Sequence, residues 1–142
     1  MDIQIATLCK SATEFPNQEM VIVGTLDTIA APELPVVIPQ CAIAMRICIT
    51  PEDSGKHQFG VNIIDADGNS LDENMPIMAD MPIELPESVP FLTRNLILNL
   101  QGLKFPEDGV YSIDLTLNDE LIQRVPLRVL KLEQGEEANV GA

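Results

Sequence analysis

The chain's most constraining feature is a strict alternation of apolar and polar residues, which recurs along its length. It is clearest at 110–118, where Tyr111, Ile113, Leu115 and Leu117 alternate with Ser112, Asp114, Thr116 and Asn118. A period of two places one set of side chains in a core and the other in water, as in a half-buried β-strand. Eleven prolines and eight glycines also leave little room for a long helix. These features together predict an all-β protein.

Further strands are expected at 3–9, 19–27, 41–49, 59–63, 75–85, 92–101 and 121–131. About eight strands with frequent turn signals are typical of an antiparallel β-sandwich, immunoglobulin-like in general architecture. Residues 1–132 are therefore predicted to form one sandwich domain. The last stretch, 133–142, is acidic and rich in small residues, and is predicted to be a flexible tail.

Two turns and one edge strand are specific predictions. Asp65–Asn69 and Asn118-Asp119 are predicted hairpin turns, since Gly, Asn and Asp tolerate positive φ. In the segment 75–86 the odd positions are apolar, and the even positions include Pro76, Pro82 and Pro86. Residues of one parity direct their N–H groups to the same side, so these prolines place the segment at a sheet edge with its proline side facing solvent. An extended proline-rich loop is the alternative.

Charge limits the classes of partner. The formal net charge is −14, which disfavours nucleic acid and anionic membrane surfaces. Seven carboxylates and no Lys or Arg lie between Lys56 and Arg94, which is half of that net charge: Asp65, Asp67, Asp72, Glu73, Asp80, Glu84 and Glu87. This stretch is either a solvated surface or a docking face for a basic partner, with Asp80 and Glu84 as candidate contact residues.

A second candidate surface is a row of polar residues at 91–101. Thr93, Asn95, Asn99 and Gln101 share one parity, opposite leucines. Such a row can bind a polar ligand or another protein, tie down a crossing loop, or face water. Arg94 falls on the apolar parity, which indicates a strand end or a buried pairing with a carboxylate.

Catalytic and metal motifs are weak. Asp65, Asp67 and Asn69 match the first positions of a calcium loop, but the later positions fail, so a structural hairpin is the favoured interpretation. The three cysteines form no CxxC pair, and His57 is the only imidazole. Cys9 and Cys41 have core parity, whereas Cys48 points the other way and could meet His57 only if the strands 41–49 and 59–63 were neighbours. No cofactor fingerprint is present, so we expect a protein that is not an enzyme and has no cofactor.

Three blocks carry a family resemblance: Ile5–Cys9 with Ser11-Ala12, Pro90–Gln101, and Gly109–Leu115 closing in Val125–Val129. The chain resembles a family of small uncharacterised bacterial proteins that share these blocks. That resemblance implies a cytosolic β-rich domain and no known activity. The stretch Glu107-x-Gly109-x-Tyr111 is also similar to the tyrosine corner of immunoglobulin-like sandwiches, in which the tyrosine hydroxyl bonds to nearby backbone.

These observations predict a cytoplasmic, non-catalytic protein-interaction or assembly module that forms a homo-oligomer or binds a protein partner. Free thiols and the absence of a signal peptide favour the cytoplasm. The alternative is a domain that binds a small ligand or a divalent cation through the acidic loop 65–73.

Overall fold

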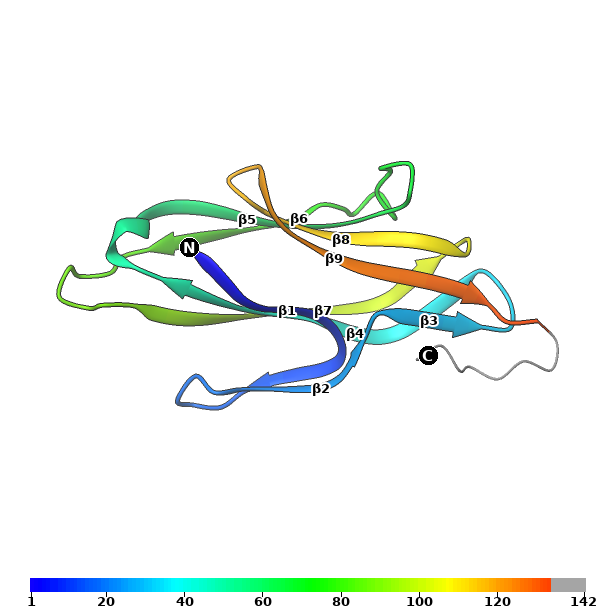
Figure 1. Ribbon diagram of the computed structural model, residues 1–142, viewed down its shortest axis with the longest axis horizontal. Coiled ribbons are helices and arrows are strands. Elements are labelled where there is room, and N and C mark those ends of the chain that lie inside the picture. Colours follow the sequence, from blue (N-terminus) through cyan, green and yellow to red (C-terminus); the bar gives the residue numbers. More distant parts are fainter. Residues whose placement is uncertain (134–142) are drawn as a thin grey trace.

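The computed structural model describes residues 1–133, which form two packed β-sheets (Figure 1). The described part contains nine strands, β1 (Asp2–Glu14), β2 (Met20–Leu26), β3 (Thr28–Ala31), β4 (Val36–Ile49), β5 (Gly55–Ile64), β6 (Ile77–Ile83), β7 (Leu92–Phe105), β8 (Gly109–Leu117) and β9 (Glu120–Lys131), and a 3-10 turn at Pro51–Asp53. One sheet has the order β2-β1-β4-β7 and the other the order β3-β9-β8-β5-β6. The predicted all-β sandwich is confirmed. The predicted tail lies, apart from Glu133, outside the described residues.

One short strand was missed. The expected strand 19–27 ends at Leu26, and after Asp27 the chain resumes as β3 in the other sheet. β3 pairs in parallel with β9, from Thr28 opposite Arg128 to Ala31 opposite Lys131. The other strand pairs of residues 1–133 are antiparallel, as predicted.

The alternating residues meet between the sheets as predicted. Cys41, Ile43, Met45, Ile47 and Ile49 of β4 are all buried, and they pack against the buried row of β8. None of the buried residues in the described part is polar or charged. The core is therefore an apolar layer, mostly aliphatic with the rings of Phe59, Phe105 and Tyr111, and it is stabilised by the removal of apolar surface from water.

The tyrosine corner is also confirmed. The hydroxyl of Tyr111 donates a hydrogen bond of 2.7 Å to the carbonyl of Glu107, and the ring meets that of Phe105 edge-on at a centroid distance of 5.0 Å. This contact fixes the chain where it crosses from β7 to β8.

Both hairpin turns form. Asn118 and Asp119 have φ of 51° and 67°, and they join β8 to β9. At the other turn, Gly68 has φ of 84° and its N–H donates to the carbonyl of Asp65.

The segment 75–86 does contain an edge strand, but a shorter one than predicted. β6 covers Ile77–Ile83 and is the last strand of its sheet. The N–H and carbonyl of Gln58 in β5 bond to Asn118, away from β6. Gln58 lies opposite Asp80, so the backbone groups of Asp80 also point away from β5, to the open side of β6. Pro82 is two residues farther along β6, so its nitrogen points to the same open side. Pro76 and Pro86 lie outside the strand, so only Pro82 blocks this edge from within it.

Within residues 1–133 no helix is long and apolar enough to cross a membrane.

Candidate functional site: an apolar groove between two edge strands

The acidic loop 65–73 uses its first carboxylate to hold its own turn. Asp65 Oδ1 accepts hydrogen bonds from the N–H groups of Asp67 and Asn69, both at 2.9 Å. Asp72 Oδ1 accepts one from the N–H of Asn74 at 2.8 Å. No group of three or more metal-ligating side chains gathers within the described residues. The loop geometry is that of the structural hairpin.

The polar row on β7 divides into two halves. Arg46 on β4 donates to Asn95 Oδ1 at 2.7 Å and to Thr93 Oγ1 at 2.9 Å. Asn99 and Gln101, farther along the strand, are exposed. Thr93 and Asn95 therefore bind a neighbouring strand of the same protein, through Arg46. Asn99 and Gln101 face solvent and remain the candidate contact residues.

Asn95 also ties down a crossing loop, which was one of the alternatives for this row. Its Nδ2 donates to Glu14 Oε1 at 2.9 Å and to the carbonyl of Gln18 at 2.8 Å. Both partners belong to the end of the β1–β2 hairpin, which bends away beneath its own sheet in Figure 1. A second small apolar cluster, made of Cys9, Ala42 and Ala44, lies between the hairpin and the rest of its sheet.

The strands of Cys48 and His57 belong to different sheets and are not neighbours. Asn118 Nδ2 donates to His57 Nδ1 at 3.0 Å, and His57 Nε2 lies 2.6 Å from the carbonyl of Asp53. Cys48 lies opposite Thr93, on the outer face of the other sheet. The hypothetical dyad is therefore not formed. Burial raises the pKa of the Cys9 and Cys41 thiols, which makes them poorer nucleophiles.

The acidic stretch surrounds β6. Asp80 is exposed on the strand itself and Glu84 is exposed just after it, with Asp72 and Glu73 before it and Glu87 after it. We call these exposed carboxylates before, on and after β6 the acidic flank of β6.

Beside this flank the structure shows a groove that the sequence analysis missed. It lies between β6 and β7, the edge strands of the two sheets, and has a volume of about 220 Å³. We call it the β6–β7 groove. Its lining is mostly aliphatic and aromatic: Met45, Phe59, Val61, Ile77, Ala79, Asp80, Met81, Arg94, Leu96, Ile97 and Leu98.

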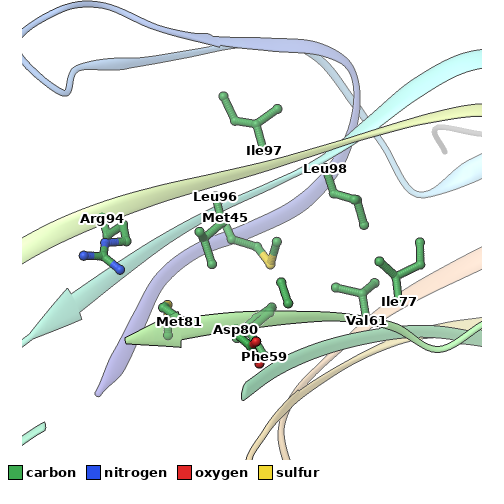
Figure 2. A pocket seen from close by; sticks show the side chains of 11 residues that line it. Met45, Phe59, Val61, Ile77, Asp80, Met81, Arg94, Leu96, Ile97 and Leu98 are labelled. Atoms are coloured by element: carbon green, nitrogen blue, oxygen red, sulfur yellow. The ribbon is translucent and has the colours of Figure 1, made fainter. Parts of the chain in front are cut away.

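Figure 2 shows how the two strands contribute. Leu96 and Leu98 point from β7 toward the β5–β6 layer, whereas Ile97 points away from it. Arg94 lies at one end, where its Nη1 donates to the carbonyl of Pro82 at 3.5 Å. The sequence left two alternatives for Arg94, a strand end or a buried pairing with a carboxylate. Arg94 lies near the start of β7, and this contact is to backbone.

Two signals in the sequence pointed toward this groove without locating it. The prolines marked β6 as an edge, and the leucines at 92–100 marked an apolar face. Each signal is local, and neither says that the two edges face each other across the sandwich.

A family model described as "Family of unknown function (DUF6941)" matches residues 4–130. The comparison with curated proteins found no match.

Two solved structures are similar to the chain, each at 12% identity. One is a β-glucosidase from Listeria innocua in complex with isofagomine, with a TM-score of 0.43; the match covers 89% of this chain but only 17% of the glucosidase. The other is an immunoglobulin-like protein from Pseudomonas aeruginosa, with a TM-score of 0.34, covering 91% of this chain and 97% of that one.

Proposed function

Because the chain belongs to the family of unknown function DUF6941, we propose its role from its surface: it is a non-catalytic protein-interaction or assembly module. The partner is another protein or a second copy of the chain, and it binds at the β6–β7 groove. The observation that carries the proposal is an apolar groove lying open at the edge of a sandwich that is otherwise strongly acidic.

The character of the groove supports this assignment. Apolar surface is costly to expose, and concave apolar patches rimmed by polar groups mark sites of interaction. Here Asp80 and Arg94 lie beside leucine, valine, methionine and phenylalanine side chains. Polar groups around an apolar centre are the usual composition of a protein–protein contact.

The non-catalytic assignment rests on the geometry of the candidate nucleophile. Cys48 lies in a different sheet from the single histidine, whose two ring nitrogens contact Asp53 and Asn118. A cytoplasmic location is supported by the three cysteines, all of which are free thiols, as expected in a reducing compartment.

The test is a pair of matched variants. Ala79 is an exposed lining residue of the groove on β6, and Val110 is an exposed residue on β8. Ala79→Arg fills the groove with a long charged side chain, whereas Val110→Arg adds the same side chain outside it. Partner retention from native cytosol and self-association by light scattering are measured for the wild-type protein and both variants.

We expect Ala79→Arg to lose the association and Val110→Arg to keep it, with thermal unfolding curves showing that both are folded. Equal binding by the wild-type protein and Ala79→Arg would refute the groove as the interaction surface. A wild-type protein that stays monomeric and retains nothing would refute the interaction role itself.

A further inference from the structure

We propose that the occupant of the β6–β7 groove is an extended segment of another protein that adds to β7 as a further strand. Its alternate side chains are apolar and enter the groove, and it carries Lys or Arg facing the acidic flank of β6. This inference rests on the proposed function and specifies the chemistry of the partner.

The first argument is the state of the four sheet edges. β3 is only four residues long, and β6 carries Pro82 with its nitrogen on the open side. β2 contains Gly24, which has φ of 68° and falls in a gap of the pairing with β1. Short strands, prolines and bulges are the usual ways to prevent a strand from adding.

β7 has the same feature only near its end, at Gly102, which has φ of 64° and falls in a gap of the pairing with β4. The stretch Leu92–Gln101 before it has none of these protections. It pairs with β4 on one side and with no strand of the described chain on the other. Its pairing with β4 is continuous from Leu92 to Gln101, and this stretch contains no proline and a single charged residue, Arg94, near its start. An unprotected edge of this length offers a row of N–H and C=O groups to an incoming strand.

The second argument is the position of the groove. A strand added to β7 points every second side chain to the same side as Leu96 and Leu98, which line the groove. The volume of about 220 Å³ exceeds the roughly 150 Å³ of an engineered cavity that accommodates benzene. The groove therefore has room for aliphatic side chains of the incoming strand.

The remaining side chains of the added strand point to the opposite face of the sheet, next to the outward-facing residues of β7. Asn99 and Gln101 are exposed there and can exchange hydrogen bonds with polar side chains. The expected partner thus alternates apolar and polar residues.

The third argument is charge. Asp80 lines the groove on the β6 side, with Arg94 at its end on β7, and Asp72, Glu73, Glu84 and Glu87 are exposed in the segments just before and after β6. These carboxylates favour a cationic partner and disfavour an acidic one, and the effect weakens with salt.

The test uses a capped nine-residue peptide that alternates valine and threonine between two terminal lysines. Two further versions carry N-methyl groups, either on all valines or on all threonines. In a strand the N–H groups of alternate residues point to opposite edges, so only one of the two methylation patterns blocks the edge that faces β7. Binding is measured by fluorescence anisotropy at low and high salt.

We expect the plain peptide to bind and one methylated version to lose at least about tenfold in affinity, with the other close to the plain peptide. If neither pattern weakens binding, the peptide occupies the groove through side chains alone, and strand addition is refuted. An equal loss with both patterns, or no binding of the plain peptide, refutes it as well.

A second set of peptides and variants tests the preference for a cationic partner. A version with terminal glutamates should bind at least about tenfold more weakly at low salt, and the difference should shrink at high salt. Asp80→Asn should reduce the preference for lysine, whereas Asp119→Asn, at the β8–β9 turn, should leave it unchanged. Equal affinity for the lysine and glutamate versions would refute the cationic partner.

These outcomes separate the two proposals. If the peptides fail but Ala79→Arg still abolishes the association of the whole protein, the proposed function stands and strand addition does not.

Discussion

The Tyr111 hydroxyl offers a direct test of how this sandwich is held together. Tyr111→Phe removes one hydrogen bond of 2.7 Å to the carbonyl of Glu107 and keeps the ring against Phe105. Tyr111 is 5% exposed, so its hydroxyl meets little water. A single neutral hydrogen bond contributes about 0.5–1.5 kcal/mol net, and we expect a loss of about 1 kcal/mol in the free energy of unfolding, or a decrease of about 3–4 °C in Tm.

Tyr111→Ala is the matched comparison, because it removes the ring as well as the hydroxyl. The loss of an aromatic side chain from a core costs about 3–5 kcal/mol. Urea unfolding followed by circular dichroism measures both variants, with the wild-type slope as the check that the unfolded states are alike. If Tyr111→Phe were as stable as the wild-type protein, or as unstable as Tyr111→Ala, the argument from the tyrosine corner would be wrong.

The contribution of Tyr111 to the stability of the fold should also depend on pH. Burial raises the pKa of Tyr111 above its ordinary value of 10.0 in the folded state. The unfolded chain therefore loses this proton first, and the stability advantage of tyrosine over phenylalanine declines as the pH rises above about 10. The chain has one tyrosine and no tryptophan, so ultraviolet absorbance reports this titration alone. A midpoint at or below that of the urea-unfolded chain would contradict the assignment.

Three further predictions concern other contacts. Asn95→Ala should release the β1–β2 hairpin from β7, because Asn95 holds Glu14 and Gln18, at a cost of about 1–2 kcal/mol. Faster hydrogen exchange confined to that hairpin would show it, and unchanged exchange would contradict it. Gly60→Ala places a methyl group against Met78 on β6 and Thr116 on β8 and should lower the free energy of unfolding in urea by about 1–3 kcal/mol. A variant as stable as the wild-type protein would mean that these two side chains move aside without cost. The N–H of Thr50 lowers the pKa of Asp53 below 3.8, so the advantage of the wild-type protein over Asp53→Asn, about 1 kcal/mol, should be present above that pH and decline as the pH falls below it. An equal difference in the free energy of unfolding between the wild-type protein and Asp53→Asn at pH 6 and at pH 3 would contradict this prediction.

Local pattern was enough to predict much of the fold. The alternation at 110–118 predicted β8, and the spacing of Glu107 and Tyr111 predicted the corner contact. The failures occur where a strand is too short for a pattern to form. Thr28–Ala31 has four residues and follows β2 after a single residue, so its change of sheet leaves no periodic signal.

The candidate site was less accessible to sequence reasoning. The polar row at 93–101 was found, but Asn95 reaches residues some 80 positions earlier in the chain, and no local pattern reports such a contact. The β6–β7 groove depends on two edges facing each other. That relation is a property of strand order, and alternation does not encode strand order.

The pairing of β3 with β9 has a consequence for how the chain is made. Thr28 lies opposite Arg128, so β3 has no partner strand until β9, far later in the chain, has been synthesised. Contacts between such distant segments slow folding, because the chain between them must be ordered first. The sheet with the order β3-β9-β8-β5-β6 therefore cannot be completed before β9 is available, and a chain truncated before β9 would expose the edge of β8 and leave β3 without its neighbour.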